Sequence, residues 1–293
     1  MLAAALLFVR QDPSPLTLPI GRPGKTTIAA GRLADMRTGA AATADDIAKA
    51  ADGKRFVFLG EQHATAPCQI LEAAVVDALA RRGRHVVVGL EMYQRPKQSV
   101  LDSFGQMDET AFLEQSDWKK QWGFDFSYYR PVFDVVRKFR IPLVGLNVPR
   151  DWVRSVGKGG FAGLPAEAKG QLPDDMKLDI SEHRQVFDSL MGGHSNVGPS
   201  MENMYSAQVL WDEGMADTAI RYLAAHKPDR KTVFVVIAGS GHVMYGQGIN
   251  RRIERRKAGD GLNVVMTESA VPVEVSNGIG DFVYVSPPPR TQG

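Results

Sequence analysis

Cysteine is almost absent from this chain: Cys68 is the single one in 293 residues. One cysteine excludes an intramolecular disulfide framework, and it excludes a zinc or iron–sulfur site built from the thiolates of one chain. Cys68 stands at the start of an apolar segment with helical period. We therefore expect a small buried side chain at this position, and a nucleophilic thiol is the alternative.

The sequence also lacks an excess of charge of either sign, since 35 basic residues face 33 acidic ones and the formal net charge is +2. Nothing in this balance indicates a nucleic acid or an anionic membrane surface as a partner. The densest basic cluster consists of Arg251, Arg252, Arg255 and Arg256. Glu254 interrupts it at helical spacing, so we expect a solvated helix face, with a phosphate-binding patch as the alternative.

No apolar run is long enough to cross a bilayer as a helix, because the apolar N-terminal segment covers only residues 1–10. This segment is similar to the core of a secretory signal, but no clean small-residue cleavage site follows it. A periplasmic or otherwise exported location and a cytoplasmic one therefore both stay open. We expect an N-terminal extension over 1–45, a single α/β domain over 46–286 and a tail over 287–293.

Short apolar runs alternate with longer segments of helical period, which is typical of a largely parallel β-sheet covered by helices. The expected strands are residues 55–59, 85–90, 141–146, 231–238, 262–267 and 281–285. The expected helices are 67–82, two short ones within 96–115, 128–139, 181–190, 200–226 and 248–257. Residues 151–179 are rich in glycine, proline and charge, and they predict a helical and irregular cap insertion. The predicted fold class is α/β, with a mostly parallel central sheet flanked by helices.

Polar side chains follow each of the first four predicted strands. The residues at these strand ends are Glu61 and His63, Glu91 and Tyr93, Asn147, and Ser240 and His242. In an open parallel sheet, ligands bind beyond the carboxyl ends of the strands. One polar residue at a strand end is usually a turn former. Four such ends together predict a functional site on one rim of the sheet.

Two Gly-x-x-His segments, Gly60–His63 and Gly239–His242, are part of this predicted rim. Their glycines permit tight turns and a close approach of backbone N–H groups to a ligand. A pair of histidines there could ligate a metal ion, shuttle a proton or hold an anion, and a buried structural role is the alternative for each. A serine nucleophile at Ser240 is disfavoured, because Ala238 and His242 stand where a nucleophile elbow needs glycine.

Five motifs in this order resemble the ChaN family of haem-binding uptake proteins, which is related to the erythromycin-esterase-like and Tiki-type proteins. The motifs are Gly60-Glu-Gln-His63, Gly89-Leu-Glu-Met92, the aromatic segment from Trp118 to Pro131, Leu146-Asn-Val-Pro149 and Ala238-Gly-Ser-Gly-His242. The resemblance runs from about residue 56 to residue 256, which is most of the chain.

This resemblance implies a bacterial protein of iron acquisition that is typically exported or lipid-anchored. It implies haem as the ligand, bound with the possible involvement of a homodimer, and a tyrosine as the ligand of the haem iron. Tyr129 matches the aromatic motif best, Tyr93 and Tyr205 are the other candidates, and core packing is an equal rival for Tyr129. Asn147 and Ser240 would lie beside the haem, and His194 could contribute. Without a cysteine near its start, the chain departs from the lipid-anchored members.

A second function stays open, namely a metal-dependent hydrolase of the esterase or peptidase type. In this hypothesis Glu61, His63, Glu91 and His242 activate a water molecule, with His63 and His242 as ligands of a divalent metal ion. Carboxylate and imidazole ligands suit zinc, manganese and iron(II) alike, so they do not identify the metal.

Overall fold

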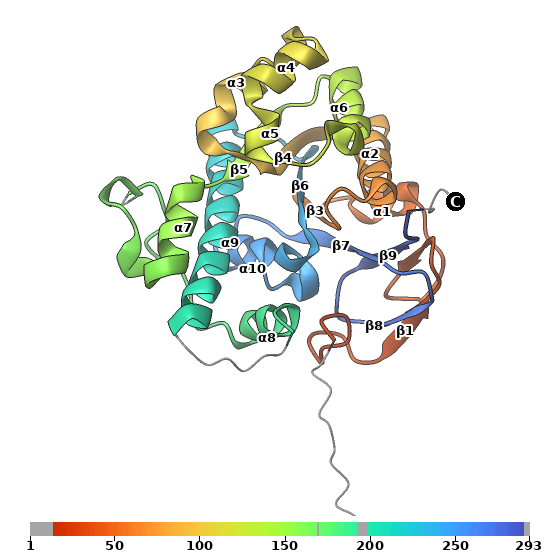
Figure 1. The fold of residues 1–293 in the computed structure, drawn as a ribbon. Coiled ribbons are helices and arrows are strands. Elements are labelled where there is room, and N and C mark those ends of the chain that lie inside the picture. The colour runs from red at the N-terminus through yellow and green to blue at the C-terminus, as the bar shows by residue number, and fades with distance from the viewer. Residues whose placement is uncertain (1–13, 169, 193–198, 290–293) are drawn as a thin grey trace, which may run out of the picture.

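The computed structural model describes residues 14–168, 170–192 and 199–289. Its centre is a seven-stranded sheet in the order β2–β9–β7–β3–β6–β4–β5 (Figure 1), in which β2 alone runs antiparallel to its neighbour. The strands of this sheet are β2 (Arg32–Asp35), β3 (Phe56–Glu61), β4 (His85–Gln94), β5 (Leu143–Asn147), β6 (Thr232–Gly239), β7 (Gly261–Glu268) and β9 (Phe282–Ser286). A separate antiparallel pair joins β1 (Lys25–Ile28) to β8 (Val273–Ser276).

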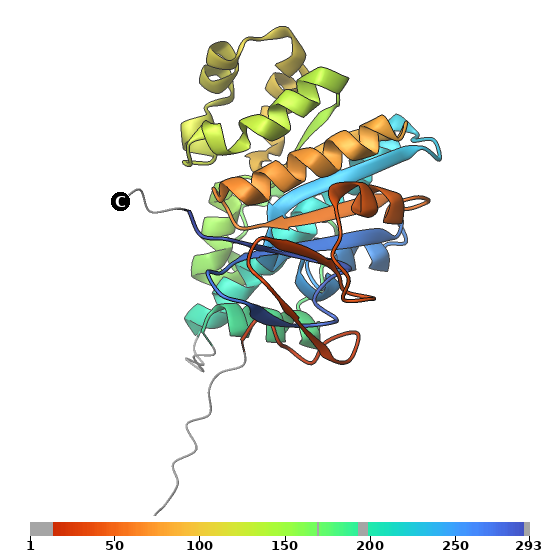
Figure 2. The ribbon, with the colours of Figure 1, turned by 90° about the vertical axis from the view of Figure 1, so that its right-hand side faces the viewer.

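Helices cover both faces of the sheet (Figure 2). Successive side chains of a strand point to opposite faces, so Val57 of β3 belongs to one core and Phe58 to the other. The first core lies under α1 (Ala44–Ala50), α2 (Ala66–Arg81) and α6 (Phe126–Phe139). The second lies under α9 (Pro199–His226) and α10 (Ile249–Arg255). The remaining α-helices are α3 (Gln98–Asp102), α4 (Glu109–Ser116), α5 (Trp118–Gln121), α7 (Arg150–Gly159) and α8 (Ser181–Leu190).

The predicted fold class is confirmed, since the sheet is mostly parallel and is flanked by helices. The six predicted strands are present, although β4 continues to Gln94, four residues beyond the expected end. Residues 14–45, which the sequence suggested as an extension, contribute β1 and β2, and β2 is part of the main sheet. Cys68 is fully buried as expected, and burial raises the pKa of its thiol to about 12.

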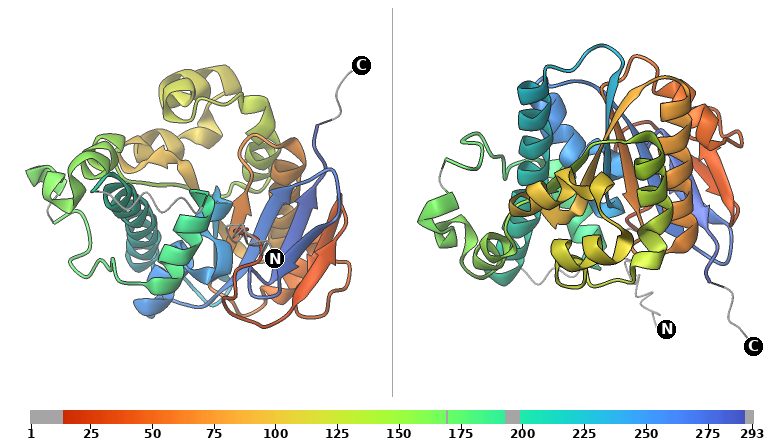
Figure 3. Two further views of the ribbon diagram at one scale, coloured as in Figure 1. Left: turned by 60° about the horizontal axis from the view of Figure 1, so that its bottom comes forward. Right: turned by 90° about the horizontal axis from the view of Figure 1, so that it is seen from above.

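The predicted cap insertion begins with α7, which lies along α9 and away from α2 in both views of Figure 3. Trp152 and Val156 of α7 pack with Leu210 of α9 in a small apolar core of their own. Two short 3-10 turns follow, at Gly160–Gly163 and Ala166–Ala168. The insertion therefore adds a helical layer beside the sheet.

Strand β5 is the edge of the sheet, and the side chain of Gln98 takes the place of a further strand. Its amide nitrogen donates to the carbonyl oxygen of Leu143 at 2.8 Å, and its amide oxygen accepts from the N–H of Gly145 at 3.0 Å. Two polar groups of the edge backbone are thus satisfied. In the ranges that the structure describes, no helix has the length and apolar character needed to cross a bilayer.

Candidate functional site

The carboxyl ends of β3, β6 and β4 lie side by side, because β6 pairs in parallel with both neighbours. Glu61 at the end of β3 lies opposite Gly239 at the end of β6. Glu91 of β4 accepts a hydrogen bond from the N–H of Gly239 at 2.7 Å. The two Gly-x-x-His segments therefore meet on one rim, as the sequence predicted.

His63 is held from behind by the buried carboxylate of Glu61, whose Oε1 lies 2.6 Å from His63 Nδ1. Glu61 is itself fixed, since it accepts hydrogen bonds from the hydroxyl of Tyr129 at 2.9 Å and from the amide of Gln69 at 2.5 Å. The other ring nitrogen of His63, Nε2, has no hydrogen-bond partner in the described part of the chain. The side chain of His63 is 33% exposed, so the ring is partly open to solvent at the rim.

The electrostatic surroundings favour a proton on His63. Burial lowers the pKa of the imidazole, but the hydrogen bond to Glu61 and the charges of Glu91 and Glu61 outweigh it, so the net pKa is raised. His63 therefore exchanges a proton closer to neutral pH than a buried, unpaired imidazole would.

His242 has a different environment, because carboxylates engage both of its ring nitrogens. Nδ1 lies 2.6 Å from Asp212 Oδ1, and Nε2 lies 3.4 Å from Glu91 Oε1. Burial lowers the pKa of His242, but the charges of Glu91 and Asp212 overcome it and raise the pKa to about 10. His242 is thus an imidazolium at neutral pH, and it serves as a fixed positive charge between two carboxylates.

Asp212 of α9 is the centre of a fully buried polar network. Its Oδ2 lies 2.8 Å from Nε2 of His183 and 3.8 Å from the guanidinium of Arg252. Burial raises the pKa of Asp212, but the charges of His242 and Arg252 outweigh it and hold the pKa below its usual range. This network stabilises the charge of His242 from the side opposite Glu91.

The expectation of a solvated face for the basic cluster is wrong for three of its four arginines. Arg252 is fully buried, and Arg255 and Arg256 both form ion pairs with the buried Glu213. The cause is the packing of α10 against α9, which covers one side of α10 and leaves Arg251 on the exposed side.

A second carboxyl group, Glu72 of α2, is buried behind Glu61. Its side chain is inaccessible to solvent and faces Glu61. Burial and the neighbouring charge of Glu61 raise the pKa of Glu72 well above its usual value. Both effects favour the neutral form of the Glu72 carboxyl group.

Tyr129, the best sequence candidate for an iron ligand, lies beneath the rim and is 1% exposed. Its hydroxyl donates to Glu61 and accepts from the N–H of Ala64 at 3.1 Å. Burial and then the charge of Glu61 raise its pKa strongly. In this arrangement Tyr129 positions Glu61, and its phenolate form is disfavoured.

The other two candidate tyrosines are also buried and paired. The hydroxyl of Tyr93 donates to Ser116 at 2.9 Å, and burial raises its pKa. The hydroxyl of Tyr205 lies 3.0 Å from Nδ1 of His183, and burial raises its pKa to about 12. Neither hydroxyl lies beside Glu61 or His63. His194, the further candidate, lies outside the described residues.

Two cavities open on either side of the Glu91–His242 pair. One, of about 280 Å³, is lined by His63, Ser240, His242, Leu190 and Met191 among others. The second, of about 300 Å³, is lined by Glu91, Trp122, Asn147, Arg150, Arg154 and Trp211 among others. Asn147 donates its amide to the carbonyl oxygen of Glu91 at 3.2 Å, and it lines the second cavity but not the first. The walls of both cavities thus combine apolar side chains with several polar and charged ones.

The predicted metal pair is not arranged for a metal ion. His242 has no free ring nitrogen, since Asp212 and Glu91 engage both. Within the described ranges, no group of three or more histidine, cysteine, aspartate or glutamate side chains is placed to hold an ion.

The motif order and this rim can be compared with known proteins. A family model described as haem-binding uptake, Tiki superfamily, ChaN, matches residues 47–253. The chain belongs to the ChaN family. Comparison with curated protein sequences finds no match.

Three solved structures are similar to this chain. ChaN of Campylobacter jejuni, which binds haem cofacially, is 19% identical with a TM-score of 0.65, over 86% of this chain and 95% of that one. The type III effector HopBA1 is 14% identical with a TM-score of 0.50, over 84% and 94% of the two chains. A variant of the erythromycin esterase EreC is 13% identical with a TM-score of 0.47, over 82% and 77%.

The sequence analysis of this ChaN-family chain missed the groups that helices bring to the rim. These are Gln69 and Glu72 of α2, His183 of α8, and Asp212 of α9. A usable signal existed for one of them, because Asp212 and Glu213 interrupt an otherwise apolar helix face. Charged residues on the inward face of a helix are rarely buried unless they are paired.

A tight contact between Gly239 and His63 gives a test of the geometry of this ChaN-type rim. A Cβ atom at Gly239 would lie 3.0 Å from Cε1 and from Nε2 of His63, while the backbone conformation of Gly239 suits alanine. We expect Gly239→Ala to fold and to displace the His63 ring, which the imidazole NMR resonances of His63 would report. Gly105→Ala is the matched control, because no atom lies within 4 Å of its added methyl group. Unchanged His63 resonances in Gly239→Ala would contradict the contact.

Proposed function

We propose that this chain binds haem at the rim, as cargo in iron uptake, with the imidazole of His63 as the ligand of the iron. Membership of the ChaN family supports haem as the ligand. The position of His63 carries the proposal for the site, because its side chain is partly exposed at the rim and its Nε2 has no protein partner in the described residues.

The contact between His63 and Glu61 supports this role chemically. A carboxylate that accepts from Nδ1–H leaves Nε2 as the lone-pair nitrogen, and it raises the basicity of the imidazole toward a metal. Tyr129 and Gln69 hold Glu61 in place, so the orientation of His63 is set before any ligand arrives. An imidazole paired with a carboxylate suits ferric iron, because the negative charge of Glu61 helps to balance the charge of the iron.

The surroundings of His63 also suit a porphyrin, which has broad apolar faces and two carboxylate side chains. Trp122 stands edge-on to the His63 ring with 4.6 Å between centroids, and Trp211 lines the neighbouring cavity. Arg150 and Arg154 line the same cavity and offer positive charge to the carboxylates.

A tyrosinate ligand remains the competing prediction from the sequence. Tyr93, Tyr129 and Tyr205 would each have to leave a hydrogen-bond partner and lose a proton while buried, which costs free energy. We therefore place His63 ahead of the tyrosines as the iron ligand.

A haem titration tests the proposal. Ferric haem added to the protein is expected to give a saturable Soret band with a histidine-type spectrum. His63→Ala should abolish saturation, and Glu61→Gln should weaken affinity by about tenfold, because outer carboxylates typically contribute that much to metal binding. His85→Ala is the control, since His85 is an exposed histidine at the opposite ends of the strands.

The possible outcomes separate the site from the function. No saturable haem binding by the wild-type protein would contradict the function. Binding that survives in His63→Ala but is lost in Tyr93→Phe, Tyr129→Phe or Tyr205→Phe would keep haem as the ligand and refute His63 as its anchor.

A hydrolase is a second candidate, and one observation favours it: the exposed imidazole of His63 is oriented by a buried carboxylate, as in a general base. Under this hypothesis the protein hydrolyses an ester or peptide, and kcat/KM rises with pH as His63 loses its proton. Activity on a panel of nitrophenyl esters and peptides is the measurement. Turnover no faster than that of His63→Ala on every substrate would eliminate the hydrolase.

A further inference from the structure

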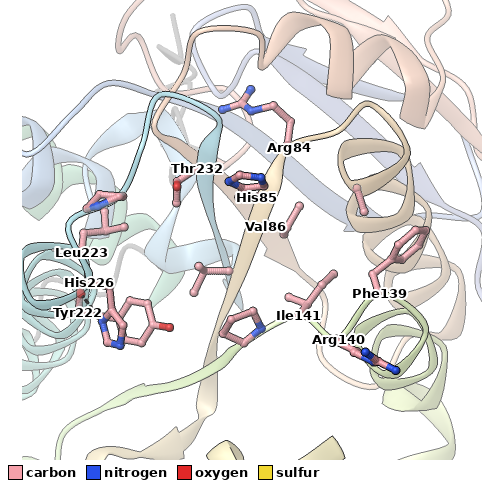
Figure 4. Close-up of a pocket in the computed structure, with 14 residues that line it drawn as sticks. Arg84, His85, Val86, Phe139, Arg140, Ile141, Tyr222, Leu223, His226 and Thr232 are labelled. Atoms are coloured by element: carbon pink, nitrogen blue, oxygen red, sulfur yellow. Dashed lines mark hydrogen bonds between the residues drawn. The ribbon is translucent and has the colours of Figure 1, made fainter.

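A separate cavity of about 430 Å³ lies at the amino ends of β4 and β6, at the other end of the sheet from the rim (Figure 4). In Figure 4, Tyr222 and His226 of α9 lie on one side of Val86, while Phe139 lies on the other. Nothing in the proposed haem function uses this cavity.

The backbone of β4 leaves a hydrogen-bonding gap in this cavity. The N–H of Val88 donates to the carbonyl oxygen of Pro142 at 3.0 Å, so Val88 turns its backbone groups toward β5. Because this direction alternates along a strand, the N–H and C=O of Val86 point the same way. Pro142 has no N–H and β5 begins only at Leu143, so no strand meets Val86.

Val86 therefore offers one donor and one acceptor to the cavity. No hydrogen bond from a loop or a side chain to either group is present in the described residues, and Val86 itself is 5% exposed. A buried backbone pair of this kind needs a partner, which water or a ligand supplies. An extended residue placed antiparallel to Val86 would exchange both hydrogen bonds with it.

The walls of the cavity are apolar and aromatic. The rings of Tyr222 and His226 stack with 3.9 Å between centroids and 21° between planes. Phe139, Ile141 and Leu223 complete the lining around them. These surfaces suit one aromatic or large aliphatic side chain.

The charges around the cavity leave one cation without a partner. Arg84 already has partners, because it donates to the carbonyl oxygens of Lys231, Ala51 and Lys54 at 2.8, 2.6 and 2.7 Å. Arg140 lines the cavity, and in the described part of the chain its side chain makes neither a hydrogen bond nor an ion pair.

The charged and imidazole groups next to Arg140 and Arg84 at this cavity already have partners. Asp229 accepts from the N–H and the hydroxyl of Thr232 and pairs with Nδ1 of His85 at 3.0 Å. Nδ1 of His226 donates to the carbonyl oxygen of Tyr222 at 2.8 Å. The unmatched charge at the mouth is thus the positive charge of Arg140.

We propose that this cavity binds an N-acylated amino acid with an apolar side chain and a free carboxylate. The amide N–H of the ligand donates to the C=O of Val86, and its carboxylate accepts from the N–H of Val86 and pairs with Arg140. Its side chain packs among Tyr222, His226 and Phe139. Each part of the ligand matches one feature of the cavity: the backbone gap, the apolar walls and the unpaired cation.

Binding of N-acetyl-L-phenylalanine, followed by NMR of the ¹⁵N-labelled full chain, tests this proposal. We expect saturable shifts of the Val86, Ile141 and Tyr222 amides with a Kd of about 0.1–1 mM, which is typical of a small fragment. Two analogues dissect the ligand: N-acetyl-L-phenylalanine amide lacks the charge, and 3-phenylpropanoate lacks the N–H donor. Each is expected to bind about three- to fivefold more weakly, the usual size of one ion pair or hydrogen bond.

The variant Arg140→Gln should raise the Kd by about threefold, consistent with a partly exposed ion pair. Arg137→Gln is the matched control, because Arg137 lies in the last turn of α6, three residues before Arg140, and does not line this cavity. Haem titration of Arg140→Gln should equal that of the wild type, which keeps this proposal independent of the haem site. Three results would overturn the proposal of an N-acylated amino acid as the ligand: no saturable shifts, equal Kd values for all three compounds, or shifts centred on His63.

Discussion

Asp212→Asn is expected to lower the free energy of unfolding by about 3–5 kcal/mol, the usual result of removing one partner from a buried charge pair. Asp212 is fully buried, and it is the carboxylate shared by His242, His183 and Arg252. The asparagine side chain has nearly the same shape as that of aspartate. The loss of unfolding free energy therefore measures the effect of removing the negative charge. In Asp212→Asn, the buried cations His242 and Arg252 would both lose the negative charge of this carboxylate.

Denaturant unfolding followed by circular dichroism measures this loss, with linear extrapolation to water. Asp188→Asn is the control, because Asp188 is exposed and pairs with Arg184 on the surface of α8. Its expected effect is below about 1 kcal/mol, as for exposed ion pairs in general. A change in Asp212→Asn no larger than that of the control would show that the buried network contributes little to stability.

The stability of the protein is expected to fall as pH rises from about 6.5 to about 10. The pKa of His242 is raised on folding to about 10 from its ordinary value of 6.5. A group with a raised pKa contributes stability that is fully present below its unfolded pKa and is lost as pH passes its folded pKa. His63, whose pKa is also raised, adds a loss of the same sign.

Asp212 and Glu91 act in the opposite pH range, since their folded pKa values are lowered. Their contribution is present above the unfolded values of 3.8 and 4.5 and is lost as pH falls below them. The contribution of this cluster to stability is therefore greatest between pH 4.5 and 6.5.

The measurement is the free energy of unfolding at constant ionic strength across this range, for the wild type and for His242→Gln. One titrating group gives a slope of at most about 1.4 kcal/mol per pH unit. The difference between the two proteins should shrink steadily above pH 6.5. A difference that stays constant up to pH 10 would mean that His242 is neutral in the folded state.

The sequence predicted the parallel sheet because its strands are short apolar runs between helical segments, a pattern that β3, β4 and β6 follow over their full buried length. It missed β1 and β2, which have four residues each with exposed positions and so lack that pattern. It also missed α1, although Thr43 and Asp46 form a capping box at its start.

The rim residues were predictable for a topological reason, since parallel strands deliver their ends to one edge. The roles of these residues were not predictable from the sequence, because each role depends on which face of a neighbouring helix packs against the rim. The sequence treats His63 and His242 as equivalent, yet α9 places a carboxylate against one of them and leaves the other exposed. Likewise, no local pattern tells that Tyr129 faces Glu61 beneath the rim while Tyr128 faces outward.

Gln98 has a consequence for how copies of this protein meet one another. An open edge strand is a template on which a second molecule can add its own strand, and such additions lead to aggregation. The side chain of Gln98 forms hydrogen bonds with the backbone of Leu143 and Gly145, so these groups of β5 are not free to pair with a strand of another molecule. Colloidal stability at high concentration thus depends in part on a single glutamine that lies far from the ligand-binding chemistry.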